Sequence, residues 1–159
     1  MLSEAEGIGL ETSFATSTIA PLMEWALPEL RTIPKPAEAD VPHWIAETDL
    51  YQRGLFDFDE HSHRTVLHMA FYLGECFVRN YDGLTWSTGN THTALANMPV
   101  VSGFNHGQEM APVLIVSNLF RRVLSGSSQS DCFERAVKAW CADAPLRRGG
   151  EAHRGPQGQ

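Results

Sequence analysis

The segment from His61 to Trp86, HSHRTVLHMAFYLGECFVRNYDGLTW, constrains the fold of this chain more than any other. At about 100° per residue, one helix face is apolar and carries Leu67, Ala70, Phe71, Gly74, Phe77, Val78 and Tyr81. Four further apolar residues widen this face to roughly 220° of the circumference: Val66, Met69, Leu73 and Cys76. A helix that is apolar over so wide an arc is predicted to be a central element of the fold.

A narrow polar seam occupies the rest of this helix, within an arc of about 80°, and holds His61, Arg64, His68, Tyr72, Glu75 and Arg79. Glu75 and Arg79 are spaced i, i+4 with the acid first, which favours an ion pair within the helix. Tyr72 is one turn before Glu75 and within reach of a hydrogen bond to it. We interpret His68, Tyr72, Glu75 and Arg79 as a structural polar seam. The alternative is a small enzyme in which His68 and Glu75 act as acid and base, in a pocket that the seam and residues 102–106 border.

The sequence holds no specific enzyme motif. Neither a G-x-S-x-G elbow nor a phosphate-binding G-x-x-x-x-G-K-[ST] loop is present. His61 and His68 are about 10 Å apart along a helix, which is too far for both to bind one metal ion. The prediction therefore includes no catalytic residue, no metal and no cofactor.

The rest of the chain predicts an α+β fold, a helix-dominated single domain with a small two- or three-stranded antiparallel sheet. Residues 1–145 form the domain, with 1–13 frayed, and 146–159 form a disordered tail. Asp59 is the expected N-cap of the long helix, and Gly83 is its expected left-handed C-cap. Other helices are expected at 18–31, after Asp40, from Pro112 to Gly126, and after a capping box at Ser128-x-x-Asp131; strands are expected at 84–88 and 98–104.

The net charge of −7 is divided unevenly. Residues 1–60 hold twelve acidic and three basic side chains (−9), and residues 61–159 hold seven acidic and nine basic ones (+2). This pattern argues against nucleic-acid binding and favours a basic protein partner, although an acidic surface also serves solubility alone. A stretch long enough to span a membrane, a secretory signal and a C-x-x-C motif are absent from the sequence, so we predict a cytoplasmic protein with reduced thiols and no membrane partner.

Aromatic and acidic residues alternate just before the long helix. Aromatic anchors surrounded by charges are typical of a protein-binding surface. The predicted partner-binding residues are Trp44, Glu47, Asp49, Tyr51, Phe56, Asp57, Asp59 and Glu60. A plainer role is open for the last three, because acids stabilise the positive end of a helix dipole.

One stretch, YLGECFVRNYDGLTW followed by MPVVSGF and a helix that begins with proline, resembles small bacterial domains, several of which look like immunity proteins of secreted-toxin systems. The resemblance covers residues 67–124. It implies that Gly74 permits close packing, that Glu75 holds Arg79, and that Trp86 fills the core. It also implies a cytoplasmic protein that neutralises a cognate toxin by occluding the active site of that toxin; a structural adaptor is the alternative.

Overall fold

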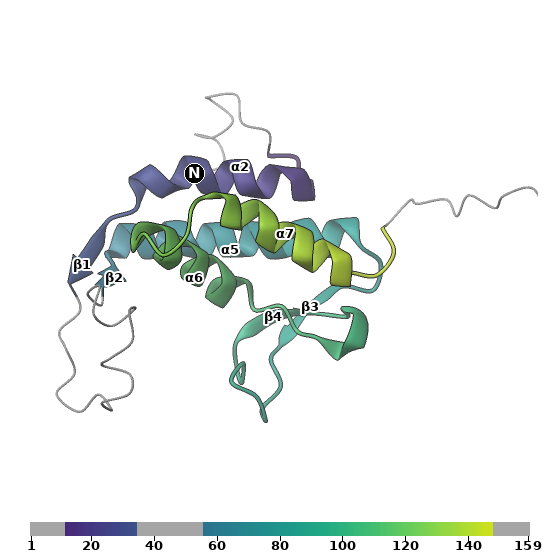
Figure 1. Ribbon diagram of the computed structural model, residues 1–159. Coiled ribbons are helices and arrows are strands. Elements are labelled where there is room, and N and C mark those ends of the chain that lie inside the picture. Colours follow the sequence, from purple (N-terminus) through teal and green to yellow (C-terminus); the bar gives the residue numbers. More distant parts are fainter. Residues whose placement is uncertain (1–11, 35–55, 148–159) are drawn as a thin grey trace, which may run out of the picture.

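Four α-helices are the longest elements in residues 12–34 and 56–147, which are the residues that the computed structural model describes (Figure 1). They are α2 (Ile19–Ala26), α5 (Glu60–Asn80), α6 (Pro112–Leu124) and α7 (Asp131–Asp143). Short 3₁₀ turns lie at η1 (Thr16–Thr18), η2 (Leu27–Glu29) and η3 (Asn105–Gly107). The strands are β1 (Thr32–Pro34), β2 (Phe56–Phe58), β3 (Thr85–Thr88) and β4 (Pro99–Ser102). The predicted α+β class, dominated by helices, is confirmed.

The strands form two separate antiparallel pairs, where the sequence predicted one small sheet. β3 pairs with β4 from Thr85 opposite Ser102 to Thr88 opposite Pro99, which confirms the two predicted strands. β1 pairs with β2, with Ile33 opposite Asp57. This second pair was not predicted, because strands of three residues are too short to show a period of two.

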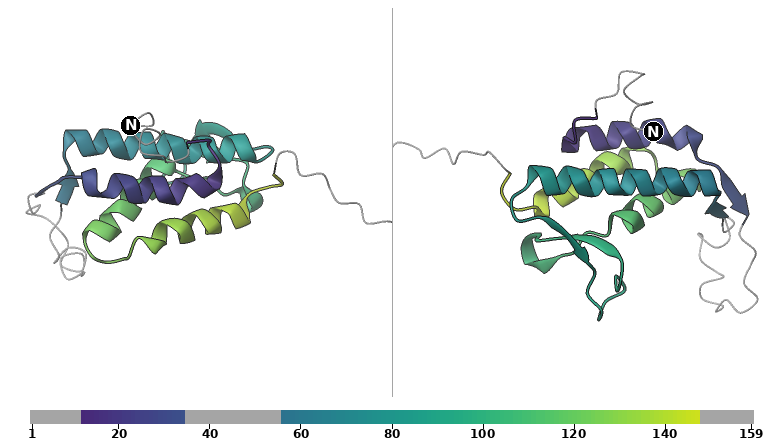
Figure 2. Two further views of the ribbon diagram at one scale, coloured as in Figure 1. Left: turned by 90° about the horizontal axis from the view of Figure 1, so that it is seen from above. Right: turned by 180° about the vertical axis from the view of Figure 1, so that it is seen from behind.

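The long helix α5 contacts elements of both strand pairs, β2, β3 and β4, as well as other helices. It packs against both α2 and α6, and α2 in turn packs against α7 (Figure 2). The carboxylate of Asp59 accepts a bond from the backbone N of Ser62 (2.8 Å), and Gly83 after the helix has a φ of 80°. The predicted Asp59 N-cap is therefore confirmed, but the C-cap is Tyr81 in an extended conformation, so the C-cap predicted at Gly83 is wrong.

The buried face of α5 is turned relative to the prediction. It is centred on Met69 and includes two polar residues, Ser62 and Thr65. Leu67 and Phe71, expected in the core, are 41% and 49% exposed. An apolar arc of roughly 220° is wider than neighbouring helices can cover, so part of it stays at the surface. Periodicity alone did not identify which part.

Three further expectations concern the rest of the chain. The last helix begins at Asp131 with Ser130 as its N-cap and no side-chain cap bond, so the capping box predicted at Ser128 is wrong. All three cysteines are free, and burial raises the pKa of the Cys76 thiol to about 12. The helix expected after Asp40 lies outside the described residues, as do residues 1–11 and 148–159.

Among the helices of the described ranges, none has the length and apolar character needed to cross a membrane.

Candidate functional site

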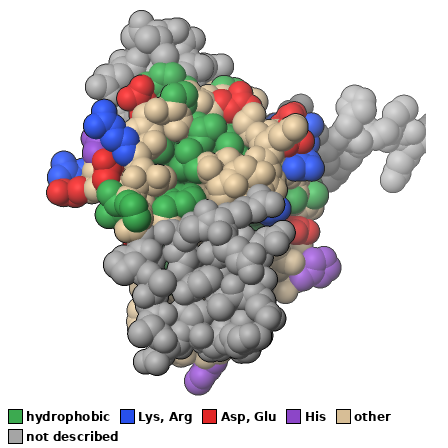
Figure 3. Space-filling model, turned by 60° about the vertical axis from the view of Figure 1, so that its left-hand side comes forward, with side chains coloured by type: hydrophobic (Ala, Val, Ile, Leu, Met, Phe, Trp, Pro, Cys, Tyr) green, Lys and Arg blue, Asp and Glu red, His purple; other side chains and the backbone are tan. Residues whose placement is uncertain are grey.

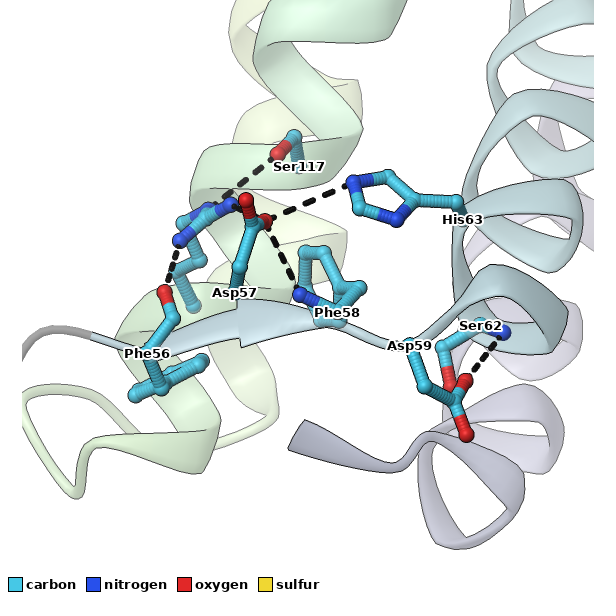
Figure 4. Close-up of polar contacts among 8 residues, drawn as sticks. Phe56, Asp57, Phe58, Asp59, Ser62, His63 and Ser117 are labelled. Carbon is cyan, nitrogen blue, oxygen red and sulfur yellow. Dashed lines mark hydrogen bonds and ion pairs between the residues drawn. The ribbon is translucent and has the colours of Figure 1, made fainter. Parts of the chain in front are cut away.

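The structure describes four of the eight predicted partner-binding residues. Phe56 and Asp57 lie on β2, and Asp59 caps α5 (Figure 4). Glu60 is the first residue of that helix. The other four lie outside the described residues: Trp44, Glu47, Asp49 and Tyr51. These four belong to a stretch that starts after Pro34 of β1 and ends before Phe56 of β2, so both its ends join this sheet.

Arg121 of α6 holds β2 against the bundle. Its guanidinium donates to the Asp57 carboxylate (2.6 Å) and to the carbonyl oxygen of Phe56 (2.5 Å), and its Nε donates to Ser117 Oγ (3.4 Å). The same group lies 4.9 Å from the centre of the Phe58 ring, which is buried in the core. His63 Nε2 is 3.4 Å from the Asp57 carboxylate (Figure 4). Asp57 therefore has a structural partner on α6.

Hydrogen bonds also determine the charge of the Asp57 side chain. Partial burial by itself raises the pKa of its carboxyl, but the bonds from Phe58 N and Arg121 outweigh burial, and the pKa is lowered from 3.8. The carboxylate is thus ionised near neutral pH and faces a cation. This pairing reduces the negative charge that β2 offers to a partner.

Asp59 is used within the fold as well. The bond from Ser62 N lowers the pKa of Asp59 from 3.8, and the Asp59 backbone N donates to the Arg31 carbonyl (3.1 Å). Arg31 N donates in turn to Ser62 Oγ (2.7 Å). Glu60 is exposed and pairs with Arg64 one turn along α5. Of the described predicted acids, Glu60 is the one with its carboxylate largely in solvent.

Apolar side chains are exposed beside these acids. Ile33, opposite Asp57 in the sheet, is 50% exposed, and Leu124, which ends α6 one turn after Arg121, is 36% exposed. Phe56 is half-buried. Figure 3 shows hydrophobic side chains gathered between two groups of charged ones on this side of the molecule. We refer to Ile33, Phe56, Asp57, Glu60 and Leu124 as the β1–β2 end.

The predicted ion pair of the polar seam is present. Glu75 accepts from Arg79 Nε (2.7 Å) with one oxygen and from Trp86 Nε1 (2.9 Å) with the other. The Trp86 bond and then the Arg79 bond lower the pKa of Glu75 from 4.5. Gly74 makes room for the Trp86 ring, because a Cβ there would lie 2.2 Å from it. Glu75 thus fixes β3 to α5.

Tyr72 does not belong to this seam. It is buried, and its hydroxyl lies 2.7 Å from Thr18 Oγ1 and accepts from Phe14 N (3.2 Å), so the expected bond to Glu75 is wrong. His68 is exposed on α5. The seam is therefore divided: Tyr72 joins the core on the α2 side, and the other three residues stay at the surface.

The acid–base alternative gains no support from this geometry. A lowered pKa makes the Glu75 carboxylate a weaker base, and both its oxygens already accept bonds. A groove of about 670 Å³ lies between α2 and α7, but neither His68 nor Glu75 lines it. In residues 12–34 and 56–147 there is no group of three or more His, Cys, Asp or Glu side chains that could hold a metal ion.

Sequence reasoning missed the exposed apolar residues Ile33, Leu67 and Phe71. A signal existed for the last two, because an apolar arc of roughly 220° exceeds what one helix buries in a small bundle. Ile33 stands alone in a Pro-rich segment, where one apolar residue carries little information.

A comparison of the chain with protein-family models, with curated proteins and with solved structures gave no match.

Proposed function

We propose that this chain is a binding protein of the immunity type, which neutralises a cognate toxin by covering the active site of that toxin. The observation that carries the proposal is the β1–β2 end, where exposed apolar residues lie beside acids and Arg121 of α6 bonds to β2. Rigid apolar anchors with a charged rim bind proteins at low entropic cost. The resemblance of residues 67–124 to immunity domains supports the same function.

The charge of the chain favours a basic partner. Residues 1–60 carry −9, and Asp57 is the acid there whose charge Arg121 of the second half compensates. Glu47, Asp49 and Glu60 supply further negative charge in this proposal, and Trp44 and Tyr51 supply aromatic anchors. Such a surface steers a basic toxin, so the association rate is expected to fall as salt rises.

The test is co-expression with the product of the gene immediately upstream. We expect this chain to restore growth of cells that make that product and to form a complex with it that survives size-exclusion chromatography. Ile33→Asp should weaken the complex at least about tenfold, as expected for an anchor at the centre of an interface.

Leu114→Asp is the matched control, since Leu114 is also an exposed leucine-sized residue but lies in the first turn of α6. It should leave binding unchanged. Absence of both growth rescue and complex formation would contradict the proposed function, and equal effects of the two substitutions would contradict the assigned surface.

A further inference from the structure

The outer face of α5 carries charges in an order that is complementary to itself. Glu60, Arg64, Leu67, Phe71 and Glu75 lie within about 80° of one another around the helix, and Arg79 lies about 40° further. Along the axis the charges run minus, plus, minus, plus, at positions 60, 64, 75 and 79. Leu67 and Phe71 lie between the two charged pairs. We refer to these six residues as the outer face of α5.

The spacing of these charges is symmetric about a point between positions 69 and 70. Positions 60 and 79 are equidistant from that point and carry opposite signs, and so do positions 64 and 75. If a second α5 lies antiparallel across this point, Glu60 comes level with Arg79 of the second copy, and Arg64 comes level with Glu75 of the second copy. Phe71 then comes level with His68 of the second copy, and Leu67 is displaced from Phe71 of the second copy by one residue along the helix axis. A two-fold interface requires this kind of self-complementarity.

The structure leaves this face open within the described residues. Seen from behind, α5 is the foremost helix, with α6 and α7 behind it and the β3–β4 pair below (Figure 2). Leu67 and Phe71 are 41% and 49% exposed. The Phe71 ring lies 5.6 Å from that of Trp86, which extends the apolar surface toward β3.

The charged residues are held in place before any partner binds. Arg79 is fixed by Glu75 and lies over the Phe14 ring at 3.9 Å, and Glu75 is fixed by Trp86. Arg64 pairs with Glu60. Side chains that are already ordered lose less conformational entropy when a second copy binds.

We propose that the chain forms an antiparallel two-fold dimer through the outer face of α5, with a second copy of itself as the partner. Apolar contact between Leu67 and Phe71 of opposite copies drives the association, and the charged pairs set its direction and register. The dimer does not depend on the proposed toxin-binding function, although the two surfaces share Glu60.

Sedimentation equilibrium of the full chain, over protein concentrations of roughly 1–500 µM, tests this proposal. We expect a reversible monomer–dimer equilibrium for the wild-type chain. The double substitution E60R/R64E keeps the net charge and the intrahelical pair but places like charges opposite each other at both contacts. It should raise the dissociation constant at least about tenfold.

The matched control is D131R/R135D on α7. Asp131 and Arg135 form another exposed i, i+4 pair, and Asp131, like Glu60, is the first residue of its helix. This control carries the same cost at the helix dipole and should leave the dimer unchanged. Circular dichroism of both variants checks that they are folded.

A mixing experiment tests the antiparallel register. E75R/R79E should also fail to pair with itself, but a mixture of E75R/R79E with E60R/R64E makes all four cross-contacts opposite in charge, so the mixture should dimerise. A wild-type chain that stays monomeric throughout the range would overturn the proposal. So would a dimer that E60R/R64E does not weaken, or variants that fail to recover dimerisation when mixed.

Discussion

The β1–β2 end, together with Arg121 of α6, and the outer face of α5 both combine an acid, an arginine and aromatic rings, but they use them differently. At the β1–β2 end, Asp57 and Arg121 are 64 residues apart in the chain and join β2 to α6. On α5, Glu75 and Arg79 are one turn apart and join α5 to β3 only through Trp86. The first ion pair connects two elements that are distant in the chain, whereas the second lies within one helix, which forms without it.

This difference shows that an acid in the sequence does not by itself indicate a surface that is open to a partner. Asp57, Asp59 and Glu75 are three of the acids that the sequence singles out, and each accepts hydrogen bonds from within the chain. The exposed apolar residues Ile33, Leu67 and Phe71 stand out less in the sequence, and our proposals place them in contact with a partner. A polar side chain indicates a binding surface only when its own bonding capacity remains open.

The strongest test of the link between α5 and β3 is Gly74→Ala. In the wild-type chain the new Cβ meets the Trp86 ring at 2.2 Å, so Trp86 has to move and its bond to Glu75 breaks. We expect a loss of about 2–3 kcal/mol in the free energy of unfolding by urea.

The same substitution in a Trp86→Ala background should have the opposite sign. Without the ring, alanine stabilises the helix by roughly 0.5–1 kcal/mol relative to glycine. A loss of similar size in both backgrounds would mean that Gly74 is needed for something other than the Trp86 ring.

Arg121→Ala and Arg79→Ala compare the two ion pairs directly. Arg121→Ala removes bonds to Phe56, Asp57 and Ser117, and we expect it to cost about 1–2 kcal/mol in urea unfolding. Arg79→Ala removes a pair on a helix surface, with an expected cost of roughly 0.2–1 kcal/mol. Arg121→Lys is the control, since lysine keeps the charge but lacks the planar group that reaches two acceptors. Equal costs for the two alanine substitutions would remove the distinction drawn here.

Local signals in the sequence predicted much of the fold. The Asp59 cap, the Gly83 turn, the strand before Thr88 and the helix that begins at Pro112 all depend on residues close together in the chain. The i, i+4 pair of Glu75 and Arg79 belongs to the same class. Such features follow from backbone preferences and helix spacing, which a single sequence carries.

Long-range bonds were beyond the reach of the sequence. Tyr72 is spaced correctly to meet Glu75, but its hydroxyl lies against Thr18, 54 residues away. Arg121 looked like an ordinary residue near the end of a helix, and it holds β2 in place. Tertiary packing chose between two arcs of α5 that were equally apolar. No local rule makes that choice, because it depends on which helices lie alongside.

The N-cap of α5, Asp59, lies between the two regions. Substitutions of Asp59 should lower the stability of the chain by different amounts. Asp59→Ala removes the acceptor for Ser62 N and should lower the urea midpoint of unfolding, whereas Asp59→Asn keeps an acceptor oxygen and should change the midpoint little. If the two variants are equally destabilised, the negative charge of Asp59 matters more than its hydrogen bond, and the interaction with the helix dipole dominates.

We expect the smallest difference between the two regions in how acid pH changes the free energy of unfolding. The effect is small because the carboxylates of Asp57 and Glu75 are both partly exposed. The folded pKa of Asp57 is lowered from 3.8 and that of Glu75 from 4.5, so in each case the folded state binds protons less readily than the unfolded chain. The stability that each carboxylate contributes is then fully present above its ordinary pKa and is lost as the pH falls through the folded value. Urea unfolding of Asp57→Asn and Glu75→Gln between about pH 7 and pH 2 measures this. The difference in the free energy of unfolding between wild type and Glu75→Gln should begin to narrow at a higher pH than the difference between wild type and Asp57→Asn. The reason is that, as the pH falls, the unfolded Glu takes up its proton before the unfolded Asp does. Gaps that stay constant down to the lowest pH would show that neither carboxylate stabilises the fold through its charge.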